Sequence, residues 1–171
     1  MKNKSSHGFT LIEILVVVVI VSILTVMGVQ MISSGSVERN LQQHGKILQA
    51  SIEFSCDQAI LQNIPYGLIV SQTAYGFSIF TNQNWQQAIY QENVLGKTLT
   101  DGSQFSLILE GQTVVLEEEE LDEVPQIICD PTGAISPFVL TLSDATGQHH
   151  YQLKTTDFWQ IKGQWLDEKN Q

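Results

Sequence analysis

Basic residues are scarce in this sequence. Of its 171 residues, 8 are Lys or Arg and 18 are Asp or Glu, which gives a formal net charge of -10. A surface this acidic repels a phosphate backbone, so we expect no nucleic-acid partner. A chain of this length has room for one domain and an additional element, and we find no internal repeat.

Cysteine is nearly absent. The two cysteines, Cys56 and Cys129, do not have the close spacing of metal ligands. Two separately buried thiols are the expected state, because free cysteine behaves as a small apolar residue. The alternative, if the domain lies outside the cytoplasm, is a disulfide between them.

Catalytic motifs are also missing. The chain has no G-x-S-x-G segment and no glycine-rich phosphate loop. His149 and His150 lie near Asp144, but adjacent residues on a strand point to opposite faces, and no further ligand pattern accompanies them. We therefore expect no catalytic residue, no metal site, no cofactor and no enzyme activity. The three tryptophans are expected to pack in the core or at sheet edges: Trp85, Trp159 and Trp165.

A run of acidic residues extends from Glu117 to Glu123. Clustered carboxylates are ligands that calcium prefers. Neighbouring residues of an extended strand alternate between faces, however, so these carboxylates would not converge on one ion. We expect a solvated hairpin edge whose charge prevents edge-to-edge pairing, and the run also suits a basic patch on a partner.

The longest apolar run lies near the N-terminus, from Phe9 to Ile32. A helix of that length reaches about 36 Å, enough to cross a hydrocarbon core. Lys2 and Lys4 precede the run, which favours a cytoplasmic N-terminus. A secretory signal peptide fits poorly, because no small-residue cleavage site follows. A plain anchor leaves Glu13 unexplained, since a carboxylate within an apolar membrane helix is costly.

Residues Gly8-Phe9-Thr10-Leu11-Ile12-Glu13 resemble the processing motif of type IV pilins and type II secretion pseudopilins. The resemblance implies cleavage by prepilin peptidase between Gly8 and Phe9, followed by N-methylation of Phe9. It also implies an assembly role for Glu13, whose carboxylate would pair with the N-terminal amine of a neighbouring subunit. Such a pair is worth more at low dielectric than in water.

The remainder of the chain predicts an α+β fold. Residues 33–64 have the spacing of an amphipathic helix that Pro65 must end. Its expected buried face comprises Val37, Leu41, Leu48, Ile52, Ser55 and Ala59. Short strands are expected beyond it at Tyr66–Val70, Tyr75–Phe80, Phe105–Leu109, Thr113–Leu116, Val124–Cys129, Phe138–Leu142, Tyr151–Lys154 and Phe158–Trp165. We expect the helix to pack on antiparallel sheet.

This body resembles the H class of type II secretion minor pseudopilins (GspH). The matching segments are Gly67-Leu68-Ile69-Val70, Tyr75-Gly76-Phe77, Trp85, the Asp130–Gly133 turn and the apolar strand Phe138–Leu142. Together with the N-terminal motif they cover nearly the whole chain. The class usually has an apolar or aromatic residue at the position of Cys129. The resemblance implies the type IV pilin-like fold.

The resemblance implies a structural subunit of the periplasmic pseudopilus that helps to move folded exoproteins through the outer membrane. Its segments would be a leader (residues 1–8), a membrane and filament-core helix (9–32), an amphipathic continuation (33–64) and a periplasmic β-rich domain (65–171). Its partners would be other major and minor pseudopilins, prepilin peptidase and the inner-membrane assembly platform. It would cross the bacterial inner membrane once. A minor pilin of a type IV pilus system and a membrane-anchored periplasmic enzyme are the alternatives.

Overall fold

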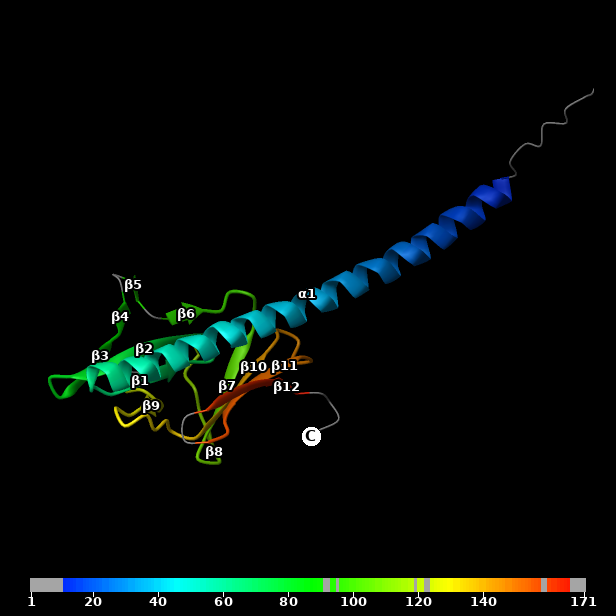
Figure 1. Cartoon of the computed structure of the whole chain (residues 1–171). Helices are drawn as coiled ribbons and strands as arrows, with labels where there is room; N and C mark the ends of the chain where they lie inside the picture. Colours follow the sequence, from blue (N-terminus) through cyan, green and yellow to red (C-terminus); the bar gives the residue numbers. More distant parts are fainter. Residues whose placement is uncertain are drawn as a thin grey trace, which may run out of the picture. The chain divides into compact units, whose positions relative to one another are not determined.

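A computed structural model describes residues 11–90, 93–94, 96–118, 120–121, 124–157 and 160–166, except for the side chains of residues 23–34, 90, 93 and 94. The chain divides into two compact units, Met1–Glu38 and Arg39–Gln171. One helix, α1 (Leu11–Gln62), provides the described part of the first unit and the start of the second (Figure 1). The predicted helix is thus confirmed, and its backbone is helical throughout these 52 residues.

The residues that follow Gln62 terminate α1. Asn63 adopts a left-handed conformation with φ 56°, which asparagine tolerates better than most residues. The Ile64 N–H donates to the Ala59 carbonyl at 3.2 Å, which is the longer bond of a Schellman motif. Pro65 follows at once and cannot continue a helix. The chain is therefore turned out of the helix and directly into the first strand.

The strands of the second unit form two main antiparallel sheets and a short ribbon. Sheet I has the order β3 (Asn84–Gln87), β2 (Ala74–Thr81), β1 (Tyr66–Val70), β9 (Ile127–Cys129), with β6 (Gly96–Thr98) also paired to β2. Sheet II has the order β12 (Ile161–Trp165), β11 (His150–Thr155), β10 (Phe138–Ser143), β7 (Gln104–Leu109), β8 (Gln112–Val114). The ribbon pairs β4 (Ile89–Tyr90) with β5 (Asn93–Val94).

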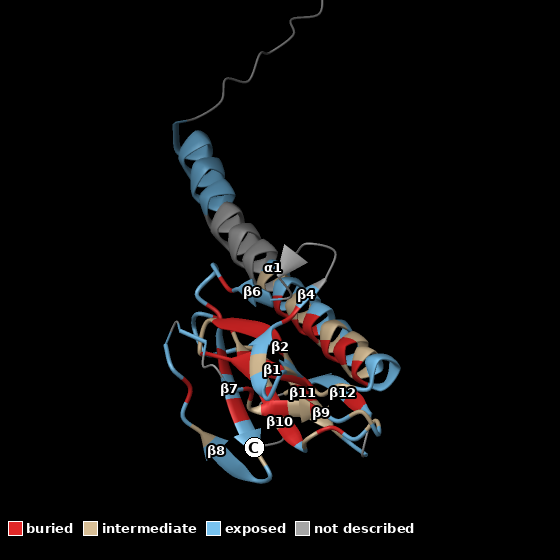
Figure 2. Cartoon of the chain, turned by 90° about the vertical axis from the view of Figure 1, so that its left-hand side faces the viewer, coloured by how far each residue is buried: buried red, intermediate tan, exposed pale blue. Residues whose placement is uncertain are grey.

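The core of the second unit lies between α1 and the sheets (Figure 2). Strands β7, β10 and β11 alternate between buried and more exposed residues, as expected for a sheet with one buried face. Strand β1 differs because all five of its residues are buried. Sheet I is therefore covered on both faces along this strand.

The predicted helical face is confirmed in this unit. Five of its six residues are almost fully buried: Leu41, Leu48, Ile52, Ser55 and Ala59. Val37, predicted on the same face, is only partly buried. They recur at intervals that keep them on one side of a helix, while Gln43 and Lys46 are exposed on the other. Burial of these apolar side chains is the main force that holds α1 to the sheets.

Most predicted strands are present, but several of their limits differ, and some short strands were not predicted. The polar stretch after Thr81, where no strand was predicted, contains β3 to β6. Strand β8 ends at Val114, two residues before the predicted end. Strand β9 begins at Ile127, three residues after the predicted start. Strand β12 comprises Ile161–Trp165, and the first two residues of the predicted strand, Phe158 and Trp159, lie outside the described residues. The short edge strands could not be predicted from their mostly polar residues, because a strand that buries neither face has no alternation of apolar and polar residues.

Candidate assembly surfaces

The N-terminal part of α1 exposes apolar side chains on all sides. Ten residues between Leu11 and Val21 are 48–85% exposed, and every side chain described from Leu11 to Ser22 is exposed. A helix that is apolar all round is stable only when other apolar groups surround it. Ser22 satisfies its hydroxyl within the helix by donating to the Val18 carbonyl at 2.7 Å. This segment therefore presents an apolar surface for partners outside the chain.

Glu13 lies in the first turn of α1, and its side chain is exposed. A carboxylate in a first turn interacts favourably with the positive end of the helix dipole. Gly8 and Phe9 lie outside the described residues, so the predicted cleavage and pairing stay predictions. Within the described residues, no helix has the length and hydrophobicity needed to cross a membrane.

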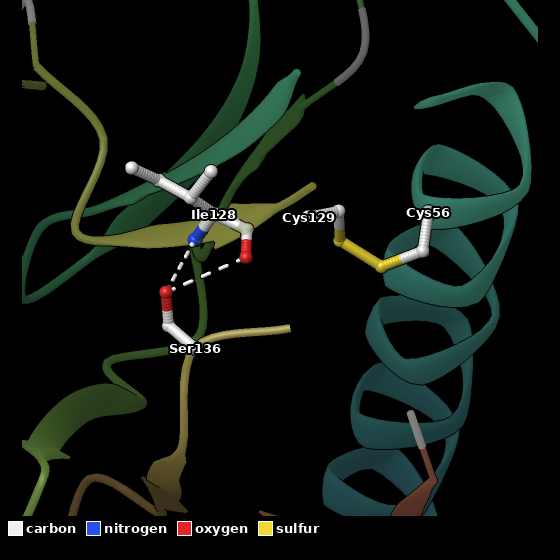
Figure 3. The surroundings of a disulfide bond; sticks show 4 residues. All are labelled: Cys56, Ile128, Cys129 and Ser136. Carbon is white, nitrogen blue, oxygen red and sulfur yellow. Dashed lines mark hydrogen bonds between the residues drawn. A yellow bond between two sulfur atoms is a disulfide. The ribbon is translucent and has the colours of Figure 1, made fainter. Parts of the chain in front are cut away.

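A disulfide joins α1 to sheet I in the second unit (Figure 3). It links Cys56 to Cys129 at the end of β9, with Cα atoms 5.1 Å apart. The prediction of two separate thiols is therefore wrong. Cys56 lies one helical turn beyond Ile52, on the edge of the buried face. Cys129 pairs with Tyr66, so its side chain shares the face of sheet I that meets the helix.

The turn after β9 is held by Ser136. Its Oγ accepts from the Ile128 N–H at 3.1 Å and lies 3.4 Å from the Ile128 carbonyl oxygen (Figure 3). Asp130 contributes within the turn, where its Oδ1 accepts from the Thr132 N–H at 2.9 Å. The predicted Asp130–Gly133 turn is thus present, and it orients the end of β9 toward α1.

A second contact fixes α1 to sheet II. Gly45 leaves room for the buried ring of Tyr151 on β11, where a Cβ atom would overlap the ring. The same tyrosine packs edge-on against Trp165, with ring centroids 5.3 Å apart. The Gln49 side chain donates to the Ile161 carbonyl at 3.1 Å. Glycine in a helix costs stability, and here it permits a closer approach than alanine would.

Asp144 and the neighbouring His149 and His150 form hydrogen bonds that stabilise the fold. Asp144 is buried, and its carboxylate accepts from the backbone N–H groups of Gln148 and His149 and from the Thr146 hydroxyl. Burial alone would raise its pKa, but these hydrogen bonds outweigh burial and hold the pKa far below the ordinary 3.8. His150 hydrogen-bonds Ser143 instead, at 2.8 Å. The described residues contain no group of three or more metal-ligating side chains.

The acidic run does not lie on a hairpin edge as predicted. Strand β8 has already ended when Glu117 is reached, and the Glu117 and Glu118 carbonyls accept from Gln72 and Thr73 in the turn between β1 and β2. The described residues of the run, Glu117, Glu118, Glu120 and Leu121, therefore belong to no strand. Glu119, Asp122 and Glu123 lie outside the described residues.

The tryptophans are placed as expected where they are described. Trp85 on β3 packs against Phe80, with ring centroids 5.2 Å apart, and Trp165 packs on Tyr151. Trp159 lies outside the described residues. The Gly45 contact and the path of the acidic run were missed by sequence reasoning, and the disulfide was only the less favoured of two alternatives. Only the disulfide had a usable signal, since Cys56 follows the spacing of the buried helical face.

Residues 3–29 match the family described as the prokaryotic N-terminal methylation motif. Type II secretion system protein H of Pseudomonas aeruginosa is 30% identical over 152 residues, covering 82% of this chain and 85% of that protein. The protein of the same name from Aeromonas hydrophila is 23% identical over 175 residues, covering 95% of each.

Two solved structures of the minor pseudopilin EpsH from the Vibrio cholerae type II secretion system share the fold. One has a TM-score of 0.66 at 16% identity, covering 77% of this chain and 98% of that one. The other has a TM-score of 0.62 at 15% identity, covering 73% and 96%. The predicted pilin-like fold is thereby confirmed, and the chain belongs to the type II secretion system protein H family, whose members are minor pseudopilins, structural subunits and not enzymes.

Proposed function

We propose that this minor pseudopilin joins the periplasmic pseudopilus through its N-terminal helix and helps to move folded exoproteins through the outer membrane. Membership of the family implies pseudopilus partners, processing by prepilin peptidase and an inner-membrane anchor. The observation that carries the proposal is the all-round exposure of apolar side chains from Leu11 to Val21. Such a surface suits the lipid before assembly and a bundle of helices after it.

The proposed sequence of events begins at the leader. Prepilin peptidase cuts between Gly8 and Phe9 and methylates the new amine. The helix of residues 9–32 holds the chain in the inner membrane once, with a cytoplasmic N-terminus and a periplasmic head. On assembly, Glu13 pairs with the amine of a neighbouring subunit, which relieves the cost of a lone carboxylate at low dielectric.

The partners on this route are the major and minor pseudopilins and the inner-membrane assembly platform. The disulfide supports a periplasmic head, because such bonds persist in oxidising compartments. The apolar helix and the disulfide-linked head are then two functional parts of one subunit: one part assembles, and the other is presented at the filament surface.

Deletion of the gene in its own bacterium tests the function. We expect exoproteins to accumulate in the periplasm while twitching motility is unchanged, and the intact gene supplied on a plasmid should restore secretion. Intact secretion with lost twitching would contradict the proposal and favour a type IV pilus role.

A further inference from the structure

The disulfide between α1 and sheet I differs in accessibility at its two ends. Cys129 is 5% exposed and belongs to the buried core, whereas Cys56 is only partly buried. The bond runs from Cys56 on the side of α1 to Cys129 at the end of β9 (Figure 3). A reagent in solution therefore meets one sulfur of the bond more readily than the other.

A pocket of about 370 Å³ leads to the bond from the side of Cys56. Cys56 is one of its lining residues and Cys129 is not. The opposite wall is the turn after β9, with Thr132 and Gly133. A Cβ atom on Gly133 would lie 3.5 Å from the Ile60 side chain of α1, so this turn approaches the helix closely. Since a water molecule occupies about 30 Å³, the pocket has room for a small organic thiol.

Two carboxylates give this pocket its charge. Glu53 and Asp57 line it together with Cys56, one helical turn apart on α1, and both are exposed. They attract a cationic reagent and repel an anionic one, most strongly at low salt. The other lining residues are uncharged, and three of them are isoleucines: Ile60, Ile135 and Ile161.

The chemistry of the bond makes access decisive. A disulfide is exchanged when a thiolate attacks one sulfur and displaces the other. Attack on Cys56 makes Cys129 leave as a buried thiolate, which slows the step because burial penalises a charge. Attack on Cys129 is harder still, because the packed core must open before a thiolate touches that sulfur. In the folded head, exchange should therefore begin at Cys56.

We propose that Cys56 is a thiol-exchange site of the head and that it takes cationic small thiols in preference to anionic ones. The incoming thiolate donates an electron pair to Cys56 Sγ and forms a mixed disulfide. The bond to Cys129 breaks, and its electron pair leaves on Cys129 Sγ, which takes a proton from water. The incoming sulfur is thus oxidised and Cys129 is reduced. This inference does not depend on the proposed function.

The return step belongs to Cys129. Strand β9 holds its thiol beside the mixed disulfide, so that, as a thiolate, it can attack Cys56 Sγ again and release the small thiol. The two cysteines then have separate roles: Cys56 receives the thiol, and Cys129 restores the original bond.

The position of the mixed disulfide tests this assignment on the unaltered full-length chain in detergent. The oxidised chain is mixed briefly with 2-aminoethanethiol and quenched with acid, and mass spectrometry of the peptides locates the adduct. We expect about tenfold more adduct on Cys56 than on Cys129, and comparable amounts when the chain is first unfolded in urea. Equal amounts in the folded chain, an excess on Cys129, or no adduct where the unfolded chain reacts would overturn the proposal.

A pair of thiols of equal length and opposite charge tests the selectivity. Rates of exchange with 2-aminoethanethiol and 2-mercaptoethanesulfonate are compared per thiolate, in the folded chain and in urea. At low salt the folded chain should prefer the cationic thiol about tenfold more than the unfolded chain does, and added salt should weaken this preference. Equal preferences in the two states would overturn the proposed selectivity.

Charge removal shows whether the pocket carboxylates cause the preference. Glu53→Gln with Asp57→Asn should reduce it to that of the unfolded chain. Glu110→Gln with Glu118→Gln removes the same net charge at exposed positions that do not line the pocket, and should leave the preference unchanged. The same preference in both double variants would show that the carboxylates at Cys56 do not select the thiol, and would overturn that part of the proposal.

Discussion

The two parts of α1 differ in the exposure of their apolar residues. From Leu11 to Val21 they point to every side and are exposed, whereas from Leu41 to Ala59 they form one face and are almost fully buried. The second part has its partners within the chain: two sheets, a disulfide and the Tyr151 ring. In the first part, every described side chain from Leu11 to Ser22 is exposed. We therefore propose that assembly depends on the first part and the stability of the head on the second.

Gly8→Ala should have the largest effect on the first part. A methyl group at the cleavage site hinders the close approach of the peptidase to the backbone, so nearly all of the chain should remain as full-length precursor. Gel migration and mass spectrometry of the N-terminus measure this, with Ser6→Ala as the control. Normal maturation and methylation of Gly8→Ala would contradict the assigned cleavage site.

Glu13→Gln should come next. It keeps the shape of the side chain and removes its charge, so cleavage should proceed while incorporation into the filament falls severalfold. Sheared filaments can be assayed by immunoblot, with Glu53→Gln, another exposed glutamate of α1, as the matched control. If Glu13→Gln assembled as well as the unaltered chain, charge pairing would not drive assembly.

The largest change in the second part should follow loss of the disulfide. Cys56→Ser with Cys129→Ser opens a loop with a sequence separation of 73, and a loop of that size predicts a destabilisation of about 4 kcal/mol. Urea unfolding of the full chain in detergent measures it, and reductant should lower the midpoint of the unaltered chain only. A midpoint equal to that of the unaltered chain would show that the bond adds nothing.

Asp144→Asn should cost about 2 kcal/mol at neutral pH, since hydrogen bonds to a charged acceptor are lost. The folded pKa of Asp144 lies below the ordinary 3.8, so its contribution is present above that pH and is lost as the pH falls toward the folded pKa. The difference in unfolding free energy between the two chains should therefore shrink below pH 3.8. A difference that stays constant down to low pH would contradict the pairing of the charge.

Gly45→Ala should have the smallest effect. Overlap with the Tyr151 ring costs about 1–3 kcal/mol, and the better helix propensity of alanine returns about 1. A net loss of about 1 kcal/mol should vanish when Tyr151→Ala is the background, because the overlap is then absent. An unchanged loss in that background would place its cause elsewhere.

Residue patterns predicted the parts of the fold where one physical signal dominates. Strand β1 was predicted at its observed limits because an apolar run lies directly after Pro65. The buried helical face was predicted from its spacing. The short strands after Thr81 were not, because their side chains are polar and partners across the sheet decide their pairing.

Less of the candidate sites than of the fold could be predicted from the sequence. Gly8, Phe9 and Glu13 stood out through their motif, independently of any fold. A pocket lined by Ser78, Trp85 and Leu121 did not, because these residues come from three segments that are far apart in the sequence. The pairing of Cys56 with Cys129 likewise depends on where β9 is inserted.

The order of strands along the chain has a consequence for how the head can be divided. The chain builds most of sheet I, moves to sheet II for β7 and β8, returns to sheet I with β9, and then completes sheet II with β10 to β12. Neither sheet is a contiguous segment, so no single cut yields an intact half. A chain that stops after β8 would lack one edge of sheet I, three strands of sheet II and the second cysteine. A cut between β8 and β9 would therefore leave neither sheet complete.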